Sequence, residues 1–256
     1  MHITVIGAGS AYEPFGVNAS ILVQEADFTL LVDCGPTVPP ALWRQGIGVE
    51  QIDALYITHC HPDHCLGLTT LINFWQHSKR RKPVLIYAQR DQWARLQQLA
   101  SFGLWPSNQC SFDILWQETL GLTSLGPWQC QTAVSRHPVR NLSLWLRSRH
   151  GTLFYSGDGR PTRYNQPWLE SADVVFQECQ SSLALPPRSN HGDWPLCQQL
   201  SRKAGSLLCP YHIGPEHQPA IREAAASFAD IRVPVAGDRI TLQQGHWRYL
   251  ITGNAL

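Results

Sequence analysis

Apolar residues along this chain follow two spacings: the alternation or short continuous runs of β-strands, and the three- to four-residue recurrence of amphipathic helices. Short strand signals fill the first 35 residues, and residues 52–58 form a further apolar run, which indicates buried strands. Further strands are predicted at residues 84–88, 128–134, 141–147, 151–156, 174–177, 239–243 and 246–251. Helices are predicted near residues 66–79, 89–102, 194–204 and 219–228. Strands in two groups with helices between them predict an α/β or α+β fold.

The length and the apolar content favour a single domain over residues 1–256. Apolar residues make up 43% of the 256, and no linker, repeat or low-complexity tract divides the chain. Residues 1–7 lack the features of a signal peptide, and no apolar window reaches the roughly 18 residues of a membrane span. The eight Cys show no paired spacing, which fits reduced thiols. We therefore expect a cytoplasmic protein without a membrane partner.

The charge pattern argues against a dedicated nucleic-acid binder, which would carry a stronger basic bias than a net charge of +1. One dense basic run, residues 77–82, precedes Pro83, so we predict that it ends a helix and is solvated. Most of the ten Trp are expected in the core. Trp194 is the exception, because it neighbours His191 and could line a pocket that holds a base.

The densest chemistry lies in residues 58–64, Thr-His-Cys-His-Pro-Asp-His. His59 and His61 alternate, so an extended backbone can point both imidazoles toward one place. Asp63 and His64 follow directly and face a neighbouring place. Two adjacent metal ions use these four ligands better than one ion can, and zinc prefers nitrogen and oxygen ligands of this kind. Cys60 and Cys65 are interpreted as small packing residues rather than ligands.

This His-x-His-x-Asp-His pattern resembles the signature of the metallo-β-lactamase superfamily, whose fold is a four-layered αββα sandwich. The resemblance implies two divalent metal ions, most readily Zn²⁺, with Mn²⁺ or iron as alternatives. It further implies that Asp33 orients a metal ligand, that His137 and His212 are ligands, and that Asp158 bridges the two ions. The implied metal ligands are His59, His61, Asp63, His64, His137, Asp158 and His212.

Within that superfamily the chain is most similar to the phosphodiesterase branch that includes ribonuclease Z. Glu178 and His191 match the Glu and His of two loops that deliver a proton in that branch, so the implied catalytic residues are Glu178, His191 and Asp63. Ribonuclease Z carries a long tRNA-gripping arm before its bridging aspartate. Here the span from His137 to Asp158 holds only two strands and a turn, which favours a smaller substrate.

The sequence therefore predicts a dinuclear metal hydrolase, a phosphodiesterase for a small phosphodiester such as a cyclic nucleotide or a short oligonucleotide, with water activated by the metals as nucleophile. Three alternatives remain: a thioester or lactone hydrolase of the same fold, ribonuclease Z-type RNA processing, and a non-enzymatic metal-binding accessory protein. A homodimer is expected from the resemblance alone.

Overall fold

The computed structural model describes residues 1–107 and 109–252. Its strands are β1 (His2–Gly7), β2 (Ser20–Glu25), β3 (Phe28–Val32), β4 (Ala54–Tyr56), β5 (Val84–Ala88), β6 (Ile114–Glu118), β7 (Ser124–Leu125), β8 (Trp128–Val134), β9 (Leu142–Ser148), β10 (Gly151–Tyr155), β11 (Val174–Glu178), β12 (Leu207–Tyr211), β13 (Arg239–Gln243) and β14 (His246–Leu250). Its α-helices are α1 (Val38–Arg44), α2 (Pro62–Cys65), α3 (Gly67–His77), α4 (Trp93–Leu104), α5 (Gln166–Ser171), α6 (Trp194–Gln199) and α7 (Gln218–Ala225). Short 3₁₀ turns cover Arg90–Gln92 and Pro215–His217.

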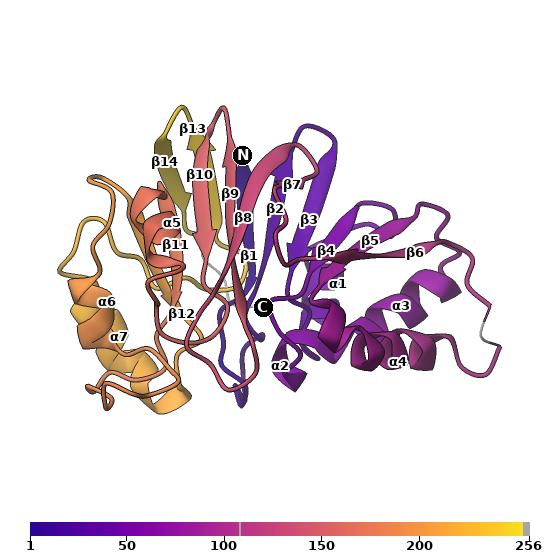
Figure 1. Cartoon of the computed structure of the whole chain (residues 1–256), viewed down its shortest axis with the longest axis horizontal. Coiled ribbons are helices and arrows are strands. Elements are labelled where there is room, and N and C mark those ends of the chain that lie inside the picture. Colours follow the sequence, from indigo (N-terminus) through magenta and orange to yellow (C-terminus); the bar gives the residue numbers. More distant parts are fainter. Residues whose placement is uncertain (108, 253–256) are drawn as a thin grey trace.

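Two sheets form the centre of the molecule. One has the strand order β14-β13-β1-β2-β3-β4-β5-β6, and the other has the order β12-β11-β10-β9-β8-β7. Helices α3 and α4 lie on the side of the first sheet, and α6 and α7 lie on the opposite side of the molecule, next to the second (Figure 1). The predicted four-layered αββα arrangement is confirmed.

The alternation of side chains along the strands explains the layers. In β2, Ile21 and Val23 face the apolar layer between the sheets, whereas Leu22 joins the layer under α1, α3 and α4. In the second sheet, Val174 faces the inter-sheet layer and Val175 packs beneath α5, α6 and α7. Strands with apolar residues on both faces read as continuous runs, and full burial of each such side chain contributes about 1.5–3 kcal/mol.

Several elements differ from the sequence prediction. The helix predicted over residues 194–204 ends at Gln199, because Leu200 adopts an extended ψ of 125°. Strand β12 was not predicted, since it contains Pro210. This Pro is tolerated because β12 is the last strand in the order of its sheet, with β11 on one side and an isolated bridge from Leu208 to Ile231 on the other. Helices α1 and α5 were also missed, and both are short and carry Pro in the first turn.

The prediction that the basic run 77–82 is a solvated surface is wrong for Arg80. Its side chain is fully buried over the Trp75 ring, 4.4 Å from the ring centroid. The guanidinium donates to the backbone carbonyls of Val49, Ile52 and Pro83 and its Nε–H to that of Lys82. Arg80 therefore fastens the end of α3 to the loop before β4.

In the part of the chain that the structure describes, no helix has the length and apolarity needed to cross a membrane.

Candidate metal centre

The His-rich segment follows β4, and its local backbone separates its ligands into two pairs. His61 is extended, with φ −85° and ψ 153°, and caps α2, which begins at Pro62. His59 Nε2 and His61 Nδ1 consequently lie 3.0 Å apart. Asp63 and His64 belong to the first turn of α2 and therefore point to a second place.

The remaining ligand candidates come from the second sheet. His137 follows β8, Asp158 follows β10 and His212 follows β12, so each stands just beyond the carboxyl end of a strand. His212 has a φ of 59°, and its amide N–H donates to the carbonyl of Ala8. Open sheets place functional groups at the carboxyl ends of their strands. Here strand ends from both sheets lie together, so candidate ligands that are far apart in sequence become neighbours.

The first group consists of His59, His61, His137 and Asp158, whose ligand atoms lie within 4.8 Å of one another. His61 Nδ1 is 3.0 Å from both His59 Nε2 and His137 Nε2, and Asp158 Oδ2 is 3.8 Å from His59 Nε2. Burial lowers the pKa of all three imidazoles, and that of His137 falls to about 4. The three rings are therefore neutral at pH 7, the form that binds a metal.

The second group consists of Asp63, His64, Asp158 and His212. Asp63 Oδ2 lies 3.0 Å from His212 Nε2 and 3.1 Å from His64 Nε2, and Asp158 Oδ1 lies 3.1 Å from His64 Nε2. Burial opposes ionisation of Asp158, but the His212 and His64 imidazoles outweigh it and hold the pKa of Asp158 well below its usual range. Asp158 thus belongs to both groups, with one oxygen turned to each.

The donor set fits two metal ions. Among the described residues, His64 Nε2 and Asp158 Oδ1 are buried atoms that take part in no hydrogen bond, although they lie 3.1 Å apart. Buried polar atoms are nearly always paired, so their convergence marks a position for a cation. Two carboxylates and five imidazoles are the oxygen and nitrogen ligands that zinc and similar ions take. The arrangement can therefore bind metal, without itself naming the metal.

Asp33 lies behind His64, as the sequence analysis expected. Its Oδ2 is 2.8 Å from His64 Nδ1, and the Thr58 amide and hydroxyl donate to its oxygens at 2.8–3.0 Å. Asp33 is fully buried and has a φ of 58°. A carboxylate on Nδ1 keeps the proton there and leaves Nε2 free to bind a metal.

Glu178 and His191 lie together, although they are 13 residues apart. Glu178 Oε1 is 3.2 Å from His191 Nδ1, and Glu178 Oε2 accepts the amide N–H groups of Gly192 at 2.6 Å and Gly159 at 3.2 Å. The Glu178 side chain is fully buried, whereas 32% of the His191 side chain is exposed. Burial lowers the pKa of His191, but the hydrogen bond and charge of Glu178 outweigh it and raise that pKa. The His191 ring centroid is 5.3 Å from that of His137, so His191 borders the first ligand group.

Asn141 is a residue that the sequence analysis missed. It is fully buried, its Oδ1 accepts the Asp158 amide at 3.1 Å, and its Nδ2 donates to the Ser156 carbonyl at 2.8 Å. A Cβ on Gly157 would lie 2.1 Å from Asn141 Oδ1, so a side chain at position 157 would displace Asn141. Asn141 contributes to the backbone geometry that presents Asp158.

Two other expectations need correction or refinement. Trp194 does not line the site: it is buried in the layer beneath α6 and stacks edge-on with Phe228. Cys65 is buried, whereas Cys60 is only half-buried, and their sulfurs are 3.8 Å apart. Near the end of the chain's last ligand loop, His217 Nδ1 lies 2.9 Å from the Ser182 hydroxyl.

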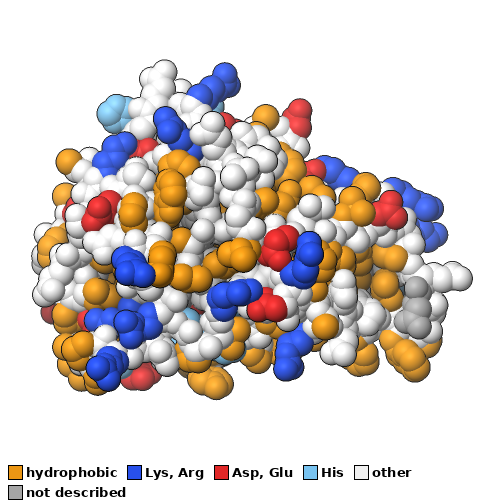
Figure 2. All heavy atoms as spheres, in the orientation of Figure 1, with side chains coloured by type: hydrophobic (Ala, Val, Ile, Leu, Met, Phe, Trp, Pro, Cys, Tyr) orange, Lys and Arg blue, Asp and Glu red, His pale blue; other side chains and the backbone are white. Residues whose placement is uncertain are grey.

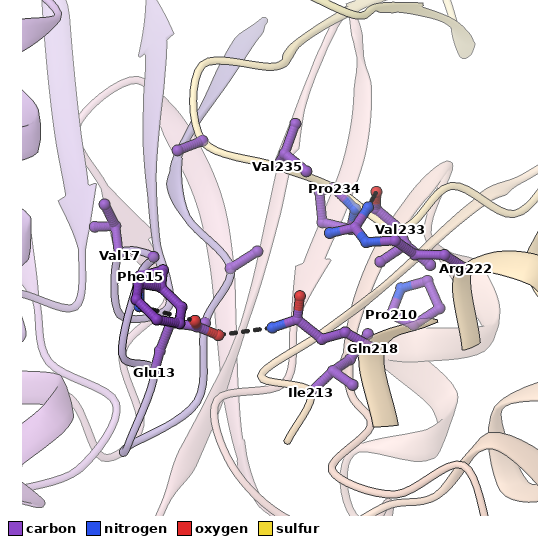
Figure 3. A pocket seen from close by; sticks show the side chains of 14 residues that line it. Glu13, Phe15, Val17, Pro210, Ile213, Gln218, Arg222, Val233, Pro234 and Val235 are labelled. Atoms are coloured by element: carbon purple, nitrogen blue, oxygen red, sulfur yellow. Dashed lines mark hydrogen bonds between the residues drawn. The ribbon is translucent and has the colours of Figure 1, made fainter. Parts of the chain in front are cut away.

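A pocket of about 240 Å³ lies between the loop after β1 and helix α7 (Figure 3). Glu13 and Gln218 point toward each other across it, and Gln218 Nε2 donates to Glu13 Oε2 at 2.6 Å. The seven ligand candidates and the Glu178–His191 pair are absent from its described lining. Its wall includes Ala8 and Ile213, so it backs the segment that carries His212.

Comparisons with known proteins agree with this geometry. The family model described as "Anti-Pycsar protein Apyc1" matches residues 1–231. An anti-Pycsar protein Apyc1 from Saccharibacillus brassicae is 29% identical over 162 residues, which cover 62% of this chain and 67% of that relative. Alignments with two Paenibacillus members each cover 36% of the relative. The chain thus spans between about a third and two thirds of these curated relatives.

The wider superfamily is also represented. A ribonuclease Z from Thermoplasma volcanium is 21% identical, with 89% of this chain and 93% of that protein covered. The metallo-β-lactamase fold protein YhfI from Bacillus subtilis superposes with a TM-score of 0.79 at 21% identity, covering 93% of this chain and 97% of that chain. The predicted metallo-β-lactamase superfamily and the likeness to the ribonuclease Z branch are confirmed.

Proposed function

Because the chain belongs to the family of the anti-Pycsar protein Apyc1, we propose that it is a two-metal phosphodiesterase that hydrolyses a small phosphodiester, such as a cyclic nucleotide or a short oligonucleotide. The observation that carries this proposal is the pair of ligand groups sharing Asp158, with the Glu178–His191 pair beside them. The first would hold the metal ions that activate water and neutralise phosphate charge, and the second would supply a proton for the leaving oxygen.

The seven ligand candidates fall into two metal-binding groups. His59, His61 and His137 would hold one metal, Asp63, His64 and His212 the other, and Asp158 would bind both. When bound, two divalent ions lower the pKa of water toward about 7 and neutralise the charge of a phosphodiester. Asp33 orients His64, and Asn141 holds the backbone of Asp158 in place.

His191 is the proposed proton donor. Glu178 sits on Nδ1, so the Nε2 side of the ring is left to face the substrate, and it also raises the pKa of His191 so that a proton is available near neutral pH. Breaking a phosphodiester releases an alkoxide, which is a poor leaving group until it is protonated. A donor poised beside the metal site therefore suits a phosphodiester with an unactivated alcohol.

The size of the substrate follows from what surrounds the site. Between His137 and Asp158 the chain forms β9, β10 and the turn that joins them, which leaves no room for a gripping arm. On the face shown in Figure 2, Lys and Arg side chains lie in separate patches with Asp and Glu between them. A short phosphodiester held mainly by the metals suits a chain with no such arm and a net charge of +1 better than an extended RNA does.

A hydrolysis screen with metal-loaded protein tests the proposal. Cyclic mononucleotides, short oligonucleotides, bis-(p-nitrophenyl) phosphate, a thioester, a lactone and a precursor tRNA would be compared under one buffer. We expect the cyclic or short phosphodiesters to give the highest kcat/KM, with little dependence on salt. Faster turnover of the thioester or lactone would refute the phosphodiesterase proposal. Preferred, steeply salt-dependent cleavage of precursor tRNA would restore the ribonuclease Z alternative.

The His191→Ala variant tests the proton donor, with His246→Ala as a matched control on an exposed histidine of β14. A general acid contributes about 10²–10⁴-fold. We expect that loss on a cyclic nucleotide and a much smaller one on bis-(p-nitrophenyl) phosphate, whose leaving group needs no proton. Metal content should stay at the wild-type level. Loss of metal in His191→Ala would identify His191 as a ligand instead.

A further inference from the structure

We propose that Arg160 is a positioning residue that fixes the loop carrying His191 to the loop carrying Asp158. The inference rests on the proposed function, since it concerns the proton donor of that same site. Arg160 stands two residues after Asp158, and His191 stands two residues before Asp193. One guanidinium joins these two segments.

The contacts of Arg160 are specific and largely screened from water. Its Nη1 donates to Asp193 Oδ2 at 2.8 Å and to the backbone carbonyl of His191 at 3.4 Å. The exposed fraction is 15% for the Arg160 side chain and 3% for that of Asp193, so this ion pair is not a loose surface contact. The backbone carbonyl of Arg160 accepts a hydrogen bond from the Arg136 amide, which fixes the backbone of Arg160 as well.

Asp193 accepts hydrogen bonds from both ends of the His191 loop. Its Oδ1 accepts the Leu196 amide and caps α6, and its Oδ2 accepts the Leu185 amide at 3.0 Å as well as Arg160. Asp193 thus ties both ends of the segment from Leu185 to the start of α6. Arg160 connects the His191 loop to the strand end that carries Asp158.

Glu178 and Arg160 hold different parts of the His191 loop. Glu178 contacts the His191 ring and accepts the Gly192 and Gly159 amides, whereas Arg160 donates to the His191 carbonyl and to Asp193. Without the Arg160 contacts, the His191 backbone would lose this second anchor, and the partly exposed ring would sample positions away from the reacting oxygen. A misplacement of about 1 Å can cost about 10²-fold in rate.

The test compares Arg160→Met, Arg160→Lys and Asp193→Asn with Arg163→Met, a control on an exposed arginine that contacts Tyr164. The substrates are a cyclic mononucleotide, with an alkoxide leaving group, and bis-(p-nitrophenyl) phosphate. We expect Arg160→Met to lower kcat on the cyclic substrate by about 10–10²-fold. KM, metal content and turnover of the activated substrate should change much less. Lys should recover part of the loss, Asp193→Asn should reproduce it, and Arg163→Met should behave as wild type.

A double variant separates positioning from general destabilisation. If Arg160 acts through His191, Arg160→Met adds little to the loss already caused by His191→Ala, because coupled residues are not additive. Equal losses on both substrates, or full additivity in the double variant, would overturn the inference while leaving the proton donor in place. If His191→Ala itself lowers both substrates equally, the proton-donor proposal fails, and the inference fails with it. The two failures are therefore distinguishable.

Discussion

The substitution Asp33→Asn tests how a residue that does not itself bind metal sets the protonation of the candidate ligand His64. Asn has nearly the same shape as Asp, so it can still accept the Thr58 amide through its oxygen. Its NH₂ group would then face His64 Nδ1, which lies 2.8 Å from Asp33 Oδ2 in the native protein. A donor there forces Nδ1 to accept and moves the ring proton to Nε2. An Nε2 that carries a proton cannot bind a metal.

The expected loss is the cost of replacing the carboxylate that orients a ligand, about 10–100-fold in metal affinity. That corresponds to about 1.4–2.7 kcal/mol. The effect should fall on the group of His64 and leave the group of His59 nearly unchanged, since Asp33 contacts only the former through a ring nitrogen. Two-step metal release by a competing chelator measures the two affinities separately. Asp53→Asn is the matched control, because Asp53 also accepts a backbone amide, that of Thr29, away from the ligands.

The reasoning fails if Asp33→Asn binds both metals as tightly as the wild type. It also fails if Asp33→Ala, which removes the carboxylate without adding a donor, weakens the second site more than Asn does. The free energy of unfolding of the metal-free protein serves as a second readout. It should fall more for Ala than for Asn, because Ala leaves the buried Thr58 amide without its partner, at about 1–3 kcal/mol.

Three further outcomes follow from the same contacts. Asp158→Ala should reduce bound metal at both sites, whereas His212→Ala should reduce it at one; elemental analysis showing at most one tightly bound metal in the reconstituted wild type would contradict the dinuclear centre. Arg80→Met should lower the free energy of unfolding by about 3 kcal/mol or more, because several buried carbonyls lose their donor, while Arg81→Met on the surface should change denaturant midpoints little. In the metal-free protein, the depressed pKa of His137, about 4, means that the unfolded chain binds more protons below pH 6.5. The stability that the neutral His137 ring contributes is therefore present above pH 6.5 and is lost as the pH falls toward 4. Over that window, the melting temperature of the His137→Gln variant should fall less than that of the wild type.

The parts of the fold that depend on local pattern were predictable. Strand β5 coincides with the predicted residues 84–88, because five apolar residues between turn residues have few other ways to be buried. Strand β12 was missed because Pro210 argues against a strand, and only its position at the sheet edge permits that residue. A position at an edge is a property of the whole sheet and cannot be read from the segment itself.

The candidate site divides in the same way. His59, His61, Asp63 and His64 lie within six positions, so their spacing alone predicts two converging pairs. His137, Asp158 and His212 were assigned by resemblance, because nothing in their local sequence brings three strand ends together. Polar residues that act through tertiary contacts, such as Asn141, carried no signal: a buried Asn and a surface Asn look alike in sequence.

The candidate ligands are divided between the two sheets. The consecutive ligands stand at the end of β4 in the first sheet, and the scattered ones stand at the ends of β8, β10 and β12 in the second. Each group takes candidate ligands from both sheets, and Asp158 belongs to both groups, so a metal ion bound at either group would join the two halves of the sandwich. The site therefore exists only when the sheets are stacked in register. Arg160 and Asn141, on the side of the second sheet, then govern how Asp158 and the His191 loop meet the ligands of the first.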